Sequence, residues 1–207
     1  MSVLFCTPCY GGMVTAQYFK SCMNAKEQFH IGGLRHDWLI GWNESLVTRA
    51  RNEMTATFLK TDWSHMMWID ADIEFEPEGI SKLWNRDHDI GVGVYSMKRA
   101  DKPLSAWRGG KLVRLEDCPN EPFEVDYAGT GFMMIRRNVI ETLAATSESY
   151  EGPNGRVPAL YMTPVHNDGF ESEDYHFCRK AREAGFKVMA DPSIRLGHWG
   201  QFSYGSV

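Results

Sequence analysis

The chain of 207 residues is long enough to bury one substantial core, as one domain or as two closely fused halves. Its hydrophobic content of 43% and charged content of 24% are ordinary for a soluble globular protein. A net charge of −5 and the lack of any Lys/Arg block argue against a nucleic-acid partner. We find no apolar run of membrane-spanning length and no signal peptide. The five cysteines follow no regular spacing, so we expect reduced thiols and a cytoplasmic protein.

Apolar runs and helical stripes alternate along the first half of the chain. Short apolar runs predict buried strands at residues 3–6, 38–41, 66–69 and 90–95. Helical periodicity predicts helices at residues 15–29, 46–60 and 77–84. This alternation predicts an α/β domain with a mainly parallel central sheet flanked by helices.

The second half of the chain is more mixed. It predicts a hairpin at 107–116 around Gly109-Gly110, a strand after Gly131, helices at 137–146 and 171–186, and a short strand at 187–190. Ser172 is the expected N-cap of the last helix, and Gly185 its C′ residue. Residues 147–158 are rich in Ser, Glu, Gly and Pro, which predicts a mobile loop. The stretch 204–207 predicts no closing helix, as expected for one domain of a longer protein.

Two carboxylates follow directly after the apolar run at 66–69. Alternate side chains of an extended chain point the same way, so Asp70 and Asp72 can face one ligand across the small Ala71. In open α/β sheets, ligands bind just outside the carboxyl ends of the strands. Close carboxylates repel one another unless a cation lies between them, and hard oxygen ligands suit Mg²⁺ or Mn²⁺ beside substrate phosphates. The second Asp-x-Asp, at 87–89, precedes a strand and is predicted to be a solvated turn.

Several other features each have a structural and a functional interpretation. The turn at 7–12 precedes a helix start, where backbone N–H groups attract phosphate. Cys6 and Cys9 form a CxxC without the second pair that a zinc site needs and without the preceding βα unit of a redox motif. Arg51 lies either on a solvated helix face or beside a nucleotide. The loop at 96–103, with Lys98, is either a basic lid over a phosphate or a simple loop.

Three later features are equally open. Gly129 and Gly131 flank Thr130 at the start of an apolar strand, which indicates either backbone close to a ligand or a β-bulge. Glu173 and Asp174 stand in the first turn of a helix, where acids also complement the helix dipole. The imidazole of His198 is either structural or a metal ligand.

This ordered set of motifs resembles the GT-A fold glycosyltransferases that use nucleotide sugars. The likeness covers most of the chain and is carried by Thr7-Pro8, Trp68-Ile69-Asp70-Ala71-Asp72, Gly129-Thr130-Gly131-Phe132, and Glu173-Asp174-Tyr175 with Phe177-Cys178-Arg179 and Ala184-Gly185-Phe186. It extends to a viral branch, the N-terminal glycosyltransferase domains of large algal-virus proteins that glycosylate the major capsid protein, which implies the host cytoplasm. The resemblance implies one GT-A domain over 1–207, with a nucleotide-sugar-binding half at 1–100 and an acceptor-binding half at 101–207.

The resemblance also implies a role for each candidate residue. The donor-site candidates are Thr7, Pro8 and Tyr10 at the base and ribose, Arg51 nearby, Asp70 on the ribose or a metal-bound water, and Lys98. The implied ligands of Mn²⁺ or Mg²⁺ are Asp72 and His198, with Asp70 beside them. The candidates at the sugar and acceptor are Trp107, Gly129, Thr130 and Gly131. Asp174 or Glu173 faces the acceptor, as a base in an inverting enzyme or as a sugar-orienting group in a retaining one.

The implied reaction moves a hexose or deoxyhexose from a nucleoside-diphosphate sugar, with UDP the expected nucleotide, to a glycan or glycoprotein. Two other classes fit part of the pattern. A haloacid-dehalogenase-like phosphohydrolase also places Asp-x-Asp after an apolar strand, but that motif normally opens the domain, whereas two strand–helix units precede it here. A non-catalytic carbohydrate- or nucleotide-binding module would use the seven Trp and eight Tyr, although aromatic residues also fill cores.

Overall fold

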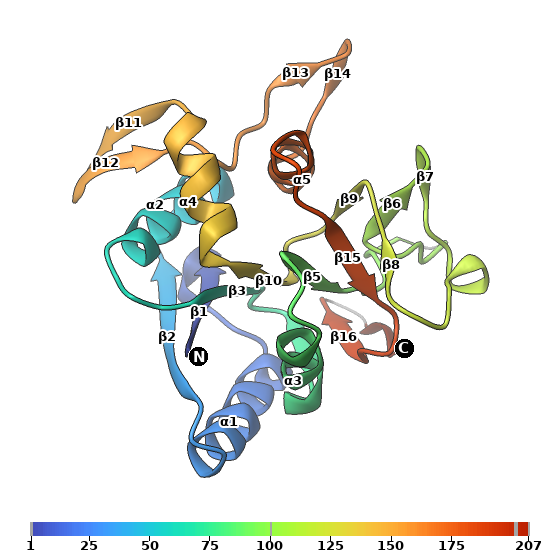
Figure 1. Ribbon diagram of the computed structural model, residues 1–207. Helices are drawn as coiled ribbons and strands as arrows, with labels where there is room; N and C mark the ends of the chain where they lie inside the picture. The colour runs from blue at the N-terminus through green and yellow to red at the C-terminus, as the bar shows by residue number, and fades with distance from the viewer. Residues whose placement is uncertain (1, 100, 201–202, 207) are drawn as a thin grey trace.

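The computed structural model describes residues 2–99, 101–200 and 203–206 (Figure 1). Residue 100 of the predicted loop and residue 207 of the stretch at 204–207 therefore lie outside the described residues. A seven-stranded sheet forms the centre, in the order β2-β1-β3-β10-β5-β15-β8. Its strands are β1 (Ser2–Cys9), β2 (Arg35–Trp42), β3 (His65–Ile69), β5 (Ile90–Gly93), β8 (Phe123–Glu124), β10 (Phe132–Arg136) and β15 (Val188–Asp191).

The sheet is mainly parallel, as predicted. β1 is parallel to both β2 and β3, and β15 is parallel to β5. β10 runs antiparallel between β3 and β5, and β8 is antiparallel at the edge. The carboxyl ends of β1, β2, β3, β5 and β15 therefore meet at one edge of the sheet, where parallel folds bind ligands.

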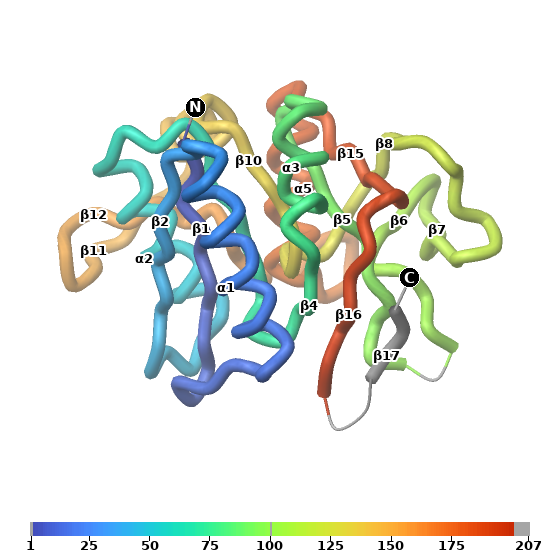
Figure 2. The backbone as a smooth tube through the Cα atoms, turned by 90° about the horizontal axis from the view of Figure 1, so that it is seen from below, coloured from blue at the N-terminus to red at the C-terminus, as the bar shows by residue number. Residues whose placement is uncertain are grey.

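Helices cover both faces of this sheet. They are α1 (Ala16–Ile31), α2 (Val47–Leu59), α3 (Pro77–Arg86), α4 (Arg137–Thr146) and α5 (Glu173–Glu183). Figure 1 shows α2, α4 and α5 on one face and α1 and α3 on the other, and Figure 2 views the second face. In β3, Met66 and Trp68 pack in the core under the first group, whereas Met67 and Ile69 pack in the core over the second. Because both faces are covered, the strand is apolar at every position.

Smaller elements complete the fold. They are two short 3₁₀ turns, η1 (Tyr10–Gly12) and η2 (Leu115–Asp117), and the strands β4 (Ile73–Phe75), β6 (Ala106–Arg108), β7 (Lys111–Leu112), β9 (Tyr127–Ala128), β11 (Ser149–Gly152), β12 (Gly155–Pro158), β13 (Val165–His166), β14 (Gly169–Phe170), β16 (Leu196–Trp199) and β17 (Ser203–Ser206). The predicted hairpin around Gly109-Gly110 is confirmed as β6–β7, and both glycines adopt positive φ. β13–β14 projects from the body just before α5 (Figure 1).

The mobile loop predicted at 147–158 is wrong, because this stretch forms the hairpin β11–β12. Val157 is buried, and the Lys60 ammonium in the turn after α2 donates to the Asn154 carbonyl at 2.5 Å. The polar composition of the stretch therefore reflects a hairpin whose exposed side chains are mostly polar while Val157 and Pro158 are buried.

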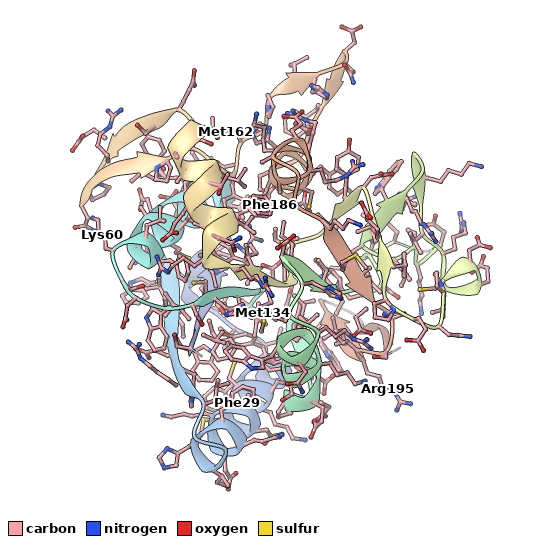
Figure 3. The ribbon with its side chains drawn as sticks, in the orientation of Figure 1. Phe29, Lys60, Met134, Met162, Phe186 and Arg195 are labelled. Atoms are coloured by element: carbon pink, nitrogen blue, oxygen red, sulfur yellow. The ribbon has the colours of Figure 1, made fainter. Side chains whose placement is uncertain are left out.

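The distribution of side chains matches the layered architecture. Figure 3 shows Met134 of β10 in the middle of the molecule and Arg195 pointing away from it. Among residues 2–99, 101–200 and 203–206, no helix combines the length and the apolar character needed to cross a bilayer.

We predict that Asn52→Ala lowers the free energy of unfolding by about 2–3 kcal/mol. The Asn52 side chain is buried in α2, accepts the N–H groups of Leu160 and Tyr161, and donates to the Tyr161 carbonyl. Alanine leaves these buried backbone groups without partners. Urea denaturation measures the loss, and Asn120→Ala on the exposed surface is the matched control. Equal stabilities of the two variants would contradict the prediction.

Candidate functional site

The acid pair lies at the end of the central strand β3. The Asp70 N–H donates to the Gly131 carbonyl at 3.0 Å, and the Ile73 N–H donates back to the Asp70 carbonyl at 3.1 Å. The chain therefore turns directly after β3 and leaves Asp70 and Asp72 at the carboxyl edge of the sheet, as the sequence predicted. Their side chains are about one-third exposed, at 31% and 33%.

A cavity of about 460 Å³ opens beside this turn. It is lined by Pro8, Cys9, Tyr10, Met13, Val14, Thr15, Gly41, Glu44, Ser45, Val47, Ala50, Arg51, Asp70, Ala71 and Asp72. Its size is within the range of small-molecule sites. Most of its wall is apolar; of its charged residues, Arg51, Asp70 and Asp72 lie at the turn after β3, and Glu44 is ion-paired to Arg49. Such a wall suits a flat aromatic base at one end and a polar group at the other.

Thr7 near the end of β1 and Tyr10 just after it differ in exposure. Tyr10 is 78% exposed beside the cavity. The Thr7 side chain is fully buried, and its hydroxyl shares a 2.7 Å hydrogen bond with the Tyr18 hydroxyl. Thr7 is absent from the cavity wall, so its side chain serves the packing of α1 on β1. The Cys9 thiol donates a hydrogen bond to the Met13 carbonyl, and Cys6 is buried in the core. Both cysteines of the CxxC therefore have structural contacts here.

Strand β16 brings His198 to Asp72. His198 pairs with Ile73 in the antiparallel β4–β16 ladder, and the Trp199 N–H donates to the Asp72 carbonyl at 2.9 Å. The imidazole Nε2 then lies 3.7 Å from Asp72 Oδ1. Residues more than 120 positions apart in the chain are thus fixed face to face by one strand register.

The hydrogen bonding of His198 determines which atom faces Asp72. Nδ1 lies 2.9 Å from the Ser96 carbonyl oxygen, which can only accept, so Nδ1 carries the proton. Burial lowers the pKa of His198, so the ring is neutral at neutral pH. The lone pair on Nε2 therefore faces a carboxylate oxygen 3.7 Å away.

This donor set fits a divalent cation. A metal-binding imidazole usually donates its other N–H to a carbonyl or carboxylate, as His198 does to Ser96. Within residues 2–99, 101–200 and 203–206, no group of three or more His, Cys, Asp or Glu side chains converges as a metal site. Asp72 and His198 alone suit Mg²⁺ or Mn²⁺, which bind through one or two protein groups plus substrate phosphates. Asp70 Oδ1 accepts a 2.9 Å hydrogen bond from Arg51, and its place beside the metal or the ribose stays a prediction.

Lys98 lies against the same carboxylate. Its ammonium is 2.5 Å from Asp72 Oδ2, and its side chain is 35% exposed. The loop at 96–103 thus holds a cation beside the acid pair, while its Ser96 carbonyl holds His198. A basic group at this position can either neutralise Asp72 or contact an anionic ligand of the cavity.

Arg51 is not on a solvated face, because only 4% of its side chain is exposed. Its Nη2 donates to Asp70 Oδ1, its Nε lies 3.7 Å from Glu173 Oε1, and its guanidinium lies over the Trp68 ring. Burial opposes the charge, but Asp70 and Glu173 outweigh it and raise the pKa of Arg51. The Nε and Nη1 atoms are buried without a hydrogen-bond partner among the described residues. Arg51 therefore joins the acid-pair turn to the start of α5.

The start of α5 carries the predicted Glu173 and Asp174. Ser172 occupies the N-cap position, but its hydroxyl donates to Asp174 instead of capping the helix. Asp174 also accepts the Tyr175 N–H at 2.9 Å. Burial, followed by repulsion from Glu173, raises the pKa of Asp174 to about 6. Asp174 is therefore a carboxylate that can take up a proton near neutral pH.

The glycines of the Gly129-Thr130-Gly131 turn allow a close approach, but to Tyr95. The Tyr95 hydroxyl accepts the Gly131 N–H at 3.2 Å, and a Cβ atom on Gly129 would lie 2.6 Å from this hydroxyl. Thr130 is buried. Sequence analysis did not single out Tyr95, although it is the last residue of the strand predicted at 90–95 and follows the observed β5. That position at the carboxyl edge was the signal that could have found it.

Trp107 takes part in the packing of α5. Its Nε1 donates to the Tyr175 hydroxyl at 2.8 Å, and the Tyr127 ring lies 5.2 Å from the Tyr175 ring. These aromatic residues are partly buried, and Tyr175 follows Asp174 in the chain. Trp107 is thus near the start of α5 without lining the cavity beside Asp70.

Comparisons with known proteins support the fold alone. No protein-family model and no curated protein matches the chain. Among solved structures, A197 from STIV aligns with a TM-score of 0.62 and 18% identity, over 97% of this chain and 86% of that one. GalNAc-T7 with UDP, GalNAc and Mn²⁺ gives 0.59 and 11%, over 95% and 43%. The catalytic domain of Drosophila beta1,4galactosyltransferase 7 with xylobiose gives 0.54 and 10%, over 93% and 66%.

These likenesses establish a GT-A type of α/β fold, as the sequence resemblance implied. This chain spans less than two thirds of each of the two transferase chains. The likeness to the algal-virus branch is not confirmed by these structures and stays a prediction.

We predict that Lys98→Met strengthens Mn²⁺ binding to the nucleotide-free protein several-fold. The ammonium and a divalent cation compete for the Asp72 carboxylate, and methionine keeps the length of the side chain without its charge. Titration of Mn²⁺ followed by electron paramagnetic resonance measures the dissociation constant. Lys111→Met, in the exposed strand β7, controls for the general loss of one positive charge. An unchanged or weaker affinity in Lys98→Met would show that Lys98 does not compete with the metal.

Proposed function

We propose that this chain is a metal-dependent glycosyltransferase that moves a hexose or deoxyhexose from a nucleoside-diphosphate sugar, with UDP the expected nucleotide, to a glycan or glycoprotein. The observation that carries the proposal is the pairing of Asp72 with the His198 lone pair beside a cavity that also contains Asp70 and Arg51. GalNAc-T7, which shares the fold, has been crystallised with UDP, GalNAc and Mn²⁺, and this supports a donor of that kind.

The donor would occupy the cavity. Tyr10, Pro8 and Val47 would offer apolar surface to the base, and the acid pair with Lys98 would face the charged part of the donor. All lining residues fall between residues 8 and 72, which supports the assignment of 1–100 as the donor-binding half. Residues 101–207 would then bind the acceptor, with Asp174 and Glu173 on α5.

Asp72 and His198 would hold Mn²⁺ or Mg²⁺. When bound there, the cation acts as a Lewis acid that neutralises charge on a departing diphosphate. Lys98 adds a second positive charge beside Asp72. Once a cation binds the Asp72 carboxylate, the Lys98 ammonium would be free to contact the phosphate oxygens. Asp70, oriented by Arg51, is left to accept hydrogen bonds from donor hydroxyl groups.

Asp174 is the proposed base for transfer with inversion. The acceptor oxygen forms a bond to the anomeric carbon as the bond to the diphosphate breaks, and the diphosphate leaves with the electron pair. The acceptor proton passes to Asp174, whose raised pKa suits this role. In a retaining enzyme the same carboxylate would orient sugar hydroxyl groups.

The phosphohydrolase alternative has weaker support. It requires Asp70 to attack phosphorus, but Asp70 Oδ1 already accepts a hydrogen bond from the buried Arg51. Two strand–helix units also precede the Asp-x-Asp here, whereas that motif normally opens such a domain. Hydrolysis of an aryl phosphate is the direct assay for this alternative.

We predict that UDP or GDP with Mn²⁺ raises the melting temperature by about 5–10 °C at about 100 times the dissociation constant. Asp72→Asn should lose the Mn²⁺-dependent part of the shift, because the amide binds a cation far less well than a carboxylate does. Asp89→Asn, in the second Asp-x-Asp at the opposite edge of the sheet, should keep it. The absence of any shift with UDP, GDP or their sugars would contradict the donor site.

We predict that transfer rises with pH through about 6 as Asp174 loses its proton. Glu173→Gln removes a neighbouring negative charge, so it should lower the pKa of Asp174 and move the acidic limb to lower pH. The charged and titratable groups around Asp174 are Glu173, Arg51, Tyr95, Tyr175 and Cys178. Rate–pH profiles of both proteins test this, with Glu183→Gln at the far end of α5 as the control. If the acidic limb of the rate–pH profile lies at the same pH in Glu173→Gln and in the wild type, Asp174 is excluded as the base.

A further inference from the structure

Tyr95 stands where three parts of the site meet, although the proposed chemistry does not use it. It follows β5, is only 7% exposed and contacts the Gly129-Thr130-Gly131 turn and His198. Its backbone is fixed on the other side by Ser105, whose hydroxyl accepts the Tyr95 N–H and whose N–H donates to the Tyr95 carbonyl. The ring therefore has one position, set by contacts on both sides.

One set of contacts leads to the acid pair. The Tyr95 hydroxyl accepts the Gly131 N–H at 3.2 Å, and the Gly131 carbonyl accepts the Asp70 N–H at 3.0 Å. The Asp70 carbonyl in turn closes the turn that carries Asp72. The hydroxyl thus supports the turn that aims the Asp72 carboxylate.

A second set of contacts leads to the imidazole. The Tyr95 and His198 rings meet edge to face, with their centroids 5.0 Å apart. The next residue, Ser96, provides the carbonyl that accepts Nδ1–H and leaves Nε2 as the lone pair. Tyr95 and Ser96 together fix the rotation and the tautomer of His198.

We propose that Tyr95 is a positioning residue that holds Asp72 and His198 at the spacing a divalent cation needs. This inference rests on the proposed function, because it assigns that cation to the Asp72–His198 pair. Tyr95 touches neither the cation nor the sugar. It sets the distance between two ligands that come from different ends of the chain, as groups behind metal ligands commonly do.

The geometry also explains why glycine stands at 129. A Cβ atom there would lie 2.6 Å from the Tyr95 hydroxyl, while its next neighbours would be at 3.4 Å. Alanine at 129 therefore collides with the hydroxyl alone. Removing the hydroxyl with phenylalanine should make alanine at 129 acceptable.

The test is a double-mutant cycle read by Mn²⁺ affinity. Tyr95→Phe and Gly129→Ala should each raise the Mn²⁺ dissociation constant about tenfold, the scale of effects from groups behind a metal ligand. In the Tyr95→Phe background, Gly129→Ala should add no further loss. Titration followed by electron paramagnetic resonance gives the four constants, and melting without metal checks that each variant is folded.

Tyr161→Phe is the matched control. The Tyr161 hydroxyl is also buried and accepts one hydrogen bond, from Trp68 Nε1 at 2.7 Å, but it lies in the core under α2 and α5. This variant should lose stability as Tyr95→Phe does while keeping the Mn²⁺ affinity of the wild type. A merely structural role for Tyr95 would give the two variants the same Mn²⁺ affinity.

The outcomes separate the two proposals. If the wild type binds no Mn²⁺, the metal site of the proposed function fails and the role of Tyr95 fails with it. If the wild type binds Mn²⁺ and Tyr95→Phe binds it equally well, only the role of Tyr95 is overturned. Gly129→Ala could also weaken Mn²⁺ binding equally in the wild-type and Tyr95→Phe backgrounds. That result would overturn the role of Tyr95, because the alanine would then not act through a collision with the Tyr95 hydroxyl.

Discussion

The arrangement of this site depends on the antiparallel register between β4 and β16. That register sets His198 opposite Ile73, so the imidazole faces the carboxylate that precedes β4. A shift by one residue would turn His198 to the other face of the ladder, because successive side chains of a strand alternate. The proposed metal site, with Asp72 and His198 as its protein ligands, would therefore depend on a rigid strand pair to keep their spacing.

Charge is distributed unevenly around this pair. On one side, Arg51 is enclosed between Asp70 and Glu173, and two acids around one buried cation leave a local excess of negative charge. On the other, Lys98 and the neutral His198 leave Asp72 with a net charge close to zero. For the proposed donor, the first region would repel a diphosphate, whereas the second would not. The donor should therefore lie with its phosphates toward Asp72 and its sugar toward Arg51 and α5.

The sequence predicted the layers of the fold well, because apolar runs and helical stripes are local signals. The strand at 66–69 and the helix at 137–146 need only their own residues to be recognised. The hairpin at 149–158 was missed, because its stability comes from docking on α2, a contact that its polar composition does not reveal. Burial of Arg51 was equally hidden, since helical periodicity placed it on a polar side that the acid-pair turn and α5 happen to cover.

The site shows the same division between local and distant information. Asp70 and Asp72 were recognisable because a buried strand ends beside them. The contacts of His198 with Tyr95 and Ser96 could not be predicted from the sequence. They join the segment after β5 to a strand about a hundred residues later. The Gly129-Thr130-Gly131 turn illustrates the limit most clearly. Its glycines were interpreted as backbone close to a ligand or as a β-bulge, and the group that lies against them in the structure is the Tyr95 hydroxyl. A glycine at the start of a strand therefore indicates that space is needed, and only the tertiary structure shows whether a ligand or the protein itself fills it.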